Sequence, residues 1–109
     1  MILGIDPGTH TSAICLYNGK KVVSCFPDVD NGILIKTIEW DYRKQIKGLV
    51  IACEVIQGRG QIVGKETFET CYLIGGIFQS FGRKNIIEVT RNEVKIELCG
   101  KCRSVKDAN

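Results

Sequence analysis

Two acidic residues, Asp6 and Glu54, each end an apolar run, and together they could bind a metal ion. The run Ile2–Asp6 reads as a buried strand stopped by a turn, and the continuous run 49–54 reads as a central strand covered on both faces. If the two strands are neighbours, both carboxylates emerge at one sheet edge, where ligand sites of open α/β sheets gather. Like charges repel there unless a cation lies between them, and carboxylate oxygens favour Mg²⁺ or Mn²⁺. Metals held in this way can activate water for phosphodiester cleavage. Solvated strand ends are the alternative interpretation.

The rest of the chain predicts elements that would position these carboxylates. Three strands come first, the second and third joined by the hairpin signal Asn18-Gly19, and strands and helices then alternate. The order β-β-β-α-β-α-β-α predicts an α/β fold with a mixed sheet and helices on its faces. The expected strands are Ile2–Asp6, Thr11–Tyr17, 21–26, 49–54 and 85–89, the expected helices are 33–45, 66–81 and a last one through Val94 and Leu98 to Gly100, and the expected loops are 27–32 and 57–64.

Local signals refine the two later helices. In 66–81, the residues at helical spacing include Phe68, Cys71 and Tyr72. Gly75 and its neighbour Gly76 would cost helix stability, which indicates a close approach of another element. The last helix is expected to begin with a capping box, in which the side chains of Thr90 and Glu93 each accept a hydrogen bond from the backbone N–H of the other residue.

Composition excludes several classes of protein. With 109 residues, 44% hydrophobic and 25% charged, the chain fits one small globular domain and excludes two-lobed kinases and large barrels. No apolar run approaches the roughly 18 residues of a membrane span, and the start does not resemble a signal peptide. The net charge of +3 favours no class of partner. Of the six cysteines, Cys15, Cys53 and Cys71 lie in apolar runs, which favours buried thiols over a disulfide framework.

Three segments carry a resemblance to a known family. The segment Gly-Ile-Asp-Pro-Gly-Thr at 4–9 resembles the first motif of the RuvC family of Holliday-junction resolvases. Ile-Ala-Cys-Glu at 51–54 resembles the second acidic motif, and 90–95 resembles the segment after the fifth strand. The likeness is closest to the short phage and Firmicute members and covers essentially the whole chain. It implies one RNase H-like domain over 1–109.

The resemblance also implies an activity and the residues that perform it. A member of this family would be a homodimer that nicks branched DNA, such as four-way junctions, with Mg²⁺. It would act in recombination, repair or phage DNA processing, in the cytoplasm of a bacterial or phage-infected bacterial cell. Asp6 and Glu54 match its first two metal-binding, catalytic acids, and Lys95 and Lys106 match basic positions near the scissile phosphate. Arg59, in the loop that would touch the junction, is an expected phosphate contact.

The end of the sequence departs from the family pattern. Family members carry a further acidic pair on a C-terminal helix, and Asp107 comes too early to match it. Ser104 and Asp107 have the spacing of a helix start, yet the sequence stops at Asn109. We therefore expect the acidic helix to be missing, with weak or no cleavage by this chain alone.

Other interpretations remain open. The chain could be a non-catalytic module for DNA binding or dimerisation. It could also be an actin/Hsp70-type nucleotide-binding fragment, because Asp-Pro-Gly-Thr at 6–9 with Ser12 resembles that phosphate loop, although that class needs two lobes. The Cys-x-x-Cys at 99–102 has no second pair for zinc and is expected to be inert. The basic residues around Trp40 could contact nucleic acid or form a solvated helix face.

Overall fold

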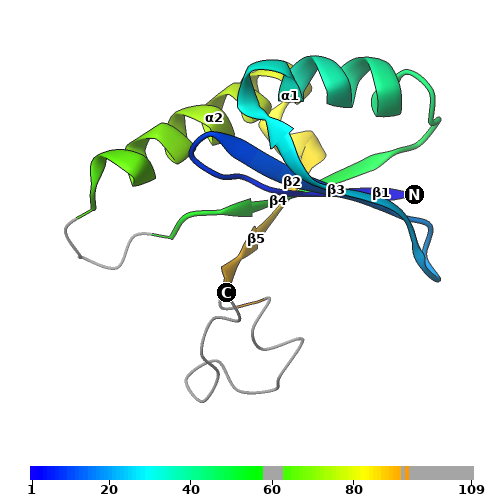
Figure 1. Cartoon of the computed structure of the whole chain (residues 1–109). Coiled ribbons are helices and arrows are strands. Elements are labelled where there is room, and N and C mark those ends of the chain that lie inside the picture. Colours follow the sequence, from blue (N-terminus) through cyan, green and yellow to red (C-terminus); the bar gives the residue numbers. More distant parts are fainter. Residues whose placement is uncertain (58–62, 92, 94–109) are drawn as a thin grey trace.

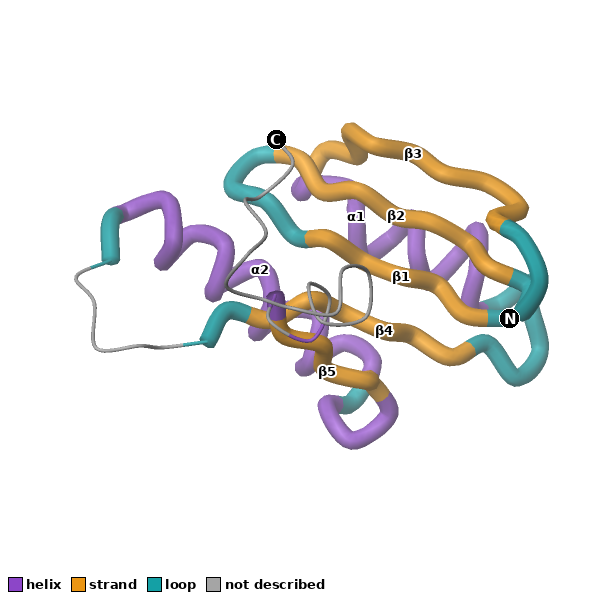
Figure 2. Tube along the Cα trace, turned by 90° about the horizontal axis from the view of Figure 1, so that it is seen from below, coloured by secondary structure: helices purple, strands orange, loops and turns teal. Residues whose placement is uncertain are grey.

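One five-stranded mixed sheet organises the protein. The computed structural model describes residues 1–57, 63–91 and 93. The strands are β1 (Ile2–Asp6), β2 (Thr11–Tyr17), β3 (Val22–Asp30), β4 (Val50–Val55) and β5 (Ile86–Thr90). They lie in the order β3-β2-β1-β4-β5, with β1 antiparallel to β2, β2 antiparallel to β3, and β4 parallel to both β1 and β5 (Figure 2). The predicted antiparallel start followed by a parallel half is confirmed.

The helices cover one face of this sheet. They are α1 (Asn31–Thr37), continued by the π-helical η1 (Ile38–Arg43), and α2 (Lys65–Phe81), which the short 3₁₀ turn η2 (Arg83–Asn85) follows. Figure 1 shows α1 and α2 on the same side of the strands. Within the described residues, the opposite face carries no helix, and no helix is long and apolar enough to span a membrane.

A buried cluster joins the helices to the sheet. Each of β1, β2 and β4 contributes alternate side chains to it, as expected for strands covered on one face. The members from these strands are Leu3, Ile5, Ile14, Leu16, Ile51 and Cys53, and those from the helices include Leu34, Ile38, Ile77 and Phe81. The alternation of these side chains places Gly4, Asp6, Ala52 and Glu54 on the opposite face, which we call the helix-free face because none of the described helices lies on it.

The predicted loop at 27–32 is wrong. β3 continues to Asp30, and α1 begins at the next residue, Asn31. Pro27 is tolerated because β3 is an edge strand and its register shifts between the partners of Ser12 and Ile14. The Asp30 side chain accepts a hydrogen bond from the Gly32 N–H at 2.7 Å, which caps the helix there. The acidic residues of this segment therefore end a strand and start a helix.

Helix α2 is confirmed, but its buried face differs from the predicted stripe. Thr70, Ile74, Ile77 and Phe81 are buried. Phe68 is 51% exposed, Tyr72 is 71% exposed, and Cys71 is an exposed free thiol. A Cβ on Gly76 would lie 3.4 Å from Ile35 Cδ1, so this glycine allows α1 and α2 to approach each other closely, whereas Gly75 faces open space. Apolar residues thus occur on both sides of α2, and spacing alone does not identify the buried side.

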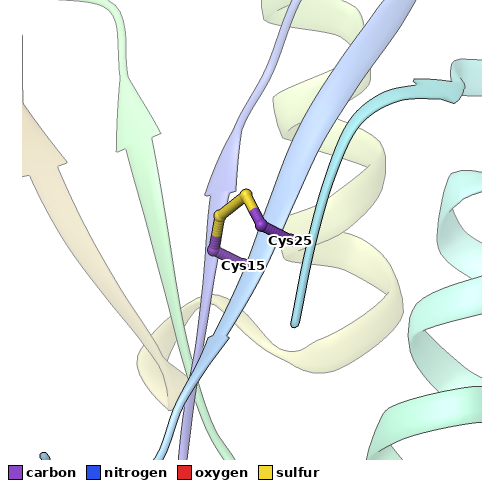
Figure 3. Close-up of a disulfide and its surroundings, with 2 residues drawn as sticks. All are labelled: Cys15 and Cys25. Atoms are coloured by element: carbon purple, nitrogen blue, oxygen red, sulfur yellow. A yellow bond between two sulfur atoms is a disulfide. The ribbon is translucent and has the colours of Figure 1, made fainter. Parts of the chain in front are cut away.

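The expectation of free buried thiols is wrong for Cys15. Cys15 on β2 and Cys25 on β3 are directly opposite each other, with Cα atoms 4.2 Å apart, and form a disulfide (Figure 3). The hairpin register brings the two side chains to the same face of the sheet, which is why a bond can form. Cys53 is a buried thiol, as predicted.

Reduction of this disulfide is expected to lower the thermal stability. The bond closes a loop between residues 10 apart in sequence, and a loop of this size is worth about 3 kcal/mol in chain entropy. Adding a phosphine reductant should therefore lower the melting temperature by on the order of 10 °C in a calorimetric scan. The double variant Cys15→Ser/Cys25→Ser should melt at the reduced temperature with or without reductant. Equal melting temperatures for oxidised and reduced wild type would contradict the expectation.

Candidate functional site

The structure brings the two predicted acids together. β1 and β4 are parallel neighbours, and Ile5 is paired with Cys53. Asp6 and Glu54 are the next residues along these two strands, which places them at the same edge of the sheet. Since Ile5 and Cys53 point into the helix-covered core, both carboxylates point to the helix-free face. The prediction that the two strands are neighbours is thus confirmed, and their parallel pairing places both acids at one edge of the sheet.

Apolar residues flank this pair on the outer strands. Ala13 on β2 is opposite Asp6, and Val89 on β5 is opposite Glu54. Asp6 is exposed, whereas the Glu54 side chain is 24% exposed. Neither of these strand neighbours carries a positive charge.

Arg91, a residue that the sequence patterns did not single out, supplies a positive charge beside Glu54. Its Nε lies 3.6 Å from Glu54 Oε1, directly after the end of β5. The side chain of Arg91 is half-exposed. A usable signal was present, because a residue that follows a strand parallel to β4 must arrive at the same sheet edge as Glu54.

The thiol of Cys53 adds no charge to this site at neutral pH. The side chain is 0% exposed, and burial, helped by the nearby charges of Glu54, Asp6 and Glu88, raises the pKa of Cys53 to about 12. The thiol therefore stays protonated beside the carboxylates and serves as part of the core.

Hydrogen bonds within the protein hold the turn after Asp6 and engage the hydroxyl groups of Ser12 and Thr9. Ser12 is 2% exposed; its Oγ accepts from Gly8 N–H at 3.1 Å and donates to Asn31 Oδ1 at 2.6 Å. Thr9 is turned toward α2, with its Oγ1 3.5 Å from the Thr70 hydroxyl. A nucleotide phosphate would need these hydroxyl groups free, so the geometry disfavours the actin/Hsp70-type interpretation.

The donor set suits a small hard cation. Mg²⁺ is commonly bound by one or two protein carboxylates, with water and substrate phosphate oxygens completing its shell. Asp6 and Glu54 meet this requirement as a pair on a helix-free face. Among the described residues, no group of three or more potential metal-binding side chains comes together.

The basic cluster around Trp40 lies away from the carboxylates. η1 ends shortly before the start of β4, whereas Glu54 is near the other end of that strand. Lys44 Nζ lies 4.2 Å from the centre of the Trp40 ring, and Arg43 forms an ion pair with Glu39. These contacts are typical of a solvated helix face.

Several predicted residues lie outside the described part of the chain. Arg59, Lys95 and Lys106, the expected DNA contacts, are among them, as are Cys99 and Cys102.

The predicted capping box is confirmed: Glu93 N–H donates to Thr90 Oγ1 at 3.2 Å, and Thr90 N–H donates to Glu93 Oε2 at 3.1 Å.

Known structures share this architecture. No family profile and no curated protein sequence matches the chain. A structure of Thermus thermophilus RuvC is similar over 97% of this chain and 73% of that one, with a TM-score of 0.62 and 15% identity. T. thermophilus RuvC in complex with a Holliday junction substrate is similar over 97% and 72%, with a TM-score of 0.63 and 17% identity. At such identities the likeness establishes the fold, and this chain has the RuvC-like form of the RNase H-like fold.

Proposed function

We propose that this protein is a Mg²⁺-dependent endonuclease that cuts branched DNA, with four-way junctions as its substrates. The observation that carries the proposal is that Asp6 and Glu54 directly follow the paired residues Ile5 and Cys53 on the neighbouring parallel strands β1 and β4. The RuvC-like fold supports it, because one of the similar structures holds a Holliday junction substrate. Such an activity would serve recombination, repair or phage DNA processing in the cytoplasm of a bacterial or phage-infected cell.

The geometry suggests a division of roles among the side chains. Asp6 and Glu54 would hold Mg²⁺, with Mn²⁺ as a substitute, and the ion would supply activation of water and stabilisation of the leaving oxygen. Ala13 and Val89 flank the acids without competing charge. Arg91, beside Glu54, lies where a guanidinium could contact a DNA phosphate.

Lysine and arginine side chains elsewhere would carry the remaining DNA contacts. We assign Arg59 to a phosphate of the junction and Lys95 and Lys106 to the neighbourhood of the scissile phosphate. Since each such contact releases counterions from the DNA, the affinity for a junction should fall steeply as salt rises.

Incubation with a labelled four-way junction tests the function. The expected result with Mg²⁺ is slow cutting at symmetric positions in two opposing strands, absent in EDTA and absent with Asp6→Asn. A linear duplex of the same sequence should stay intact. Salt-dependent junction binding without cutting would favour the non-catalytic DNA-binding module, and the absence of junction binding would contradict both interpretations.

We further propose that the protein is a homodimer and that the exposed side of α2 is its interface. Phe68, Cys71 and Tyr72 are exposed on this helix, and Gly75 faces open space where a partner backbone could approach. A row of large apolar side chains in water is typical of a surface that another chain covers. Two active sites in one dimer would account for paired, symmetric cuts.

Replacing Tyr72 with arginine is expected to shift the protein toward the monomer. The side chain is 71% exposed, so the fold should tolerate the change, whereas two buried charges facing each other would destabilise a dimer. Sedimentation velocity should give a dimer for the wild type and at least a roughly tenfold weaker dimer for the variant. Lys36→Glu, a charge change on α1, is the control. A wild type that sediments as a monomer at high concentration would contradict the proposed interface.

A further inference from the structure

A closed ring of hydrogen bonds links Gly8, in the turn that follows Asp6, to the side chains of Ser12 and Asn31. Gly8 N–H donates to Ser12 Oγ at 3.1 Å, and Ser12 Oγ–H donates to Asn31 Oδ1 at 2.6 Å. The Asn31 side-chain amide completes the ring by donating to Gly8 O at 2.9 Å. Both backbone polar groups of Gly8 are thereby held by side chains from β2 and from the first residue of α1.

The ring is partly buried, and its central member, Ser12, is fully buried, which makes the bonds of the Ser12 hydroxyl group costly to lose. Ser12 is 2% exposed, and its hydroxyl group both accepts and donates. No buried side-chain nitrogen or oxygen atom in the described part of the chain lacks a hydrogen-bond partner. Removing Ser12 Oγ would leave Gly8 N–H and Asn31 Oδ1 without this partner in a partly buried site.

Further contacts join the same turn to both helices. Asn31 N–H donates to His10 O at 3.0 Å, so α1 is bonded to two residues of the turn. On the other side, Thr9 Oγ1 lies 3.5 Å from both Glu66 O and Thr70 Oγ1 of α2. Contacts with β2, α1 and α2 together therefore fix the position of the turn.

Asp6 is the last residue of β1 and directly precedes this turn. On one side it is opposite Ala13 in the β1–β2 ladder, and on the other it continues into the turn that holds Gly8. Its backbone is thus held at both ends, which limits how far its carboxylate can move relative to Glu54. A two-carboxylate site depends on such restraint, because the protein contributes few ligands of its own.

We propose that Ser12 and Asn31 are positioning residues for Asp6. They act through the turn, and their contacts within the chain leave them no direct role toward metal or DNA. This inference rests on the proposed function, since it assigns the ring to the geometry of the same metal site.

Binding of Mn²⁺, followed by the electron paramagnetic resonance signal of the free ion, tests the proposal. We expect Ser12→Ala and Asn31→Ala each to weaken binding about tenfold, as losses of supporting hydrogen bonds around metal ligands do. The double variant should be no weaker than either single one, because both changes open the same ring. Ile77→Val, a core truncation on α2, is the matched control and should lower stability while leaving Mn²⁺ affinity unchanged.

Amide hydrogen exchange at Gly8 gives a second readout that does not involve metal. The wild-type amide should be protected, and both single alanine variants should exchange faster by about tenfold or more at Gly8, whereas Ile77→Val should not single out this amide. Wild-type Mn²⁺ affinity in both variants, with weakened binding in Asp6→Asn, would overturn the positioning role and leave the proposed function standing. Equal Mn²⁺ affinity in the wild type and in Asp6→Asn would instead show that Asp6 does not hold the metal, which would overturn the proposed metal site and the positioning role together.

Discussion

Gly8→Ala is expected to destabilise the protein by about 3 kcal/mol or more, the largest stability effect predicted for a single added methyl group in this chain. A Cβ at this position would lie 2.2 Å from the backbone oxygen of Thr11. The atom it meets is backbone, so no side-chain rotation can relieve the clash, and the turn must open. Opening the turn also breaks the bond between Gly8 N–H and Ser12 Oγ. Urea unfolding followed by circular dichroism measures the loss.

Gly75→Ala is the matched control for this change. A Cβ on Gly75 meets nothing within 4 Å, and the residue lies in the interior of α2. Alanine is the better helix former by roughly 1 kcal/mol, so the control should be neutral or stabilising as a monomer. The free energy of unfolding is thus expected to fall with Gly8→Ala and to stay the same or rise with Gly75→Ala. A Gly8→Ala protein as stable as wild type would contradict the described turn.

Asp6→Asn is expected to reduce cleavage of a four-way junction by about a hundredfold or more. The amide keeps the shape of the side chain and removes the charge that would hold the cation, and metal stabilisation of the reacting oxygens is worth several kcal/mol. Asp6 is exposed, so the free energy of unfolding should change by less than about 0.5 kcal/mol. Gel-resolved single-turnover cutting rates, with urea unfolding of the same samples, give both numbers.

Asp41→Asn provides the charge-matched control. Asp41 lies on η1, well before β4 begins, so its loss should leave cutting unchanged. Junction affinity in EDTA should be at least as high for Asp6→Asn as for wild type, because a negative charge near the DNA has been removed. Undiminished cutting by Asp6→Asn would show that the acid at the end of β1 is not part of the active site.

The sequence was sufficient to predict the frame of the site. The continuous apolar run 49–54 predicts a central strand, and β4 is one, but the expected cover on both faces is wrong for the described helices, which lie only on the face of Ile51 and Cys53. The Asn18-Gly19 signal predicts the antiparallel hairpin of β2 and β3. Together these place Asp6 and Glu54 at ends of strands that the register makes neighbours. The capping box at Thr90 was predictable for the same reason, since its signal is local.

What the sequence did not reveal depends on contacts between distant segments. Asn31 carries no recognisable motif, yet it bonds to Gly8, 23 residues away. The buried side of α2 is decided by where α1 and the sheet lie, and Phe68 and Tyr72 are as apolar as the residues that are buried. The Cys15–Cys25 bond depends on the register of β2 against β3, which includes a shift between Leu16 and Tyr17 that the Asn18-Gly19 signal does not specify.

Mn²⁺ binding, measured by electron paramagnetic resonance, shows whether Asp6 and Glu54 hold one divalent ion between them. We expect one site in the wild type that Asp6→Asn and Glu54→Gln each weaken by about tenfold or more, and that Asp41→Asn leaves intact. Mg²⁺ should displace the bound Mn²⁺. Equal Mn²⁺ affinity in the wild type, Asp6→Asn and Glu54→Gln would contradict the claim.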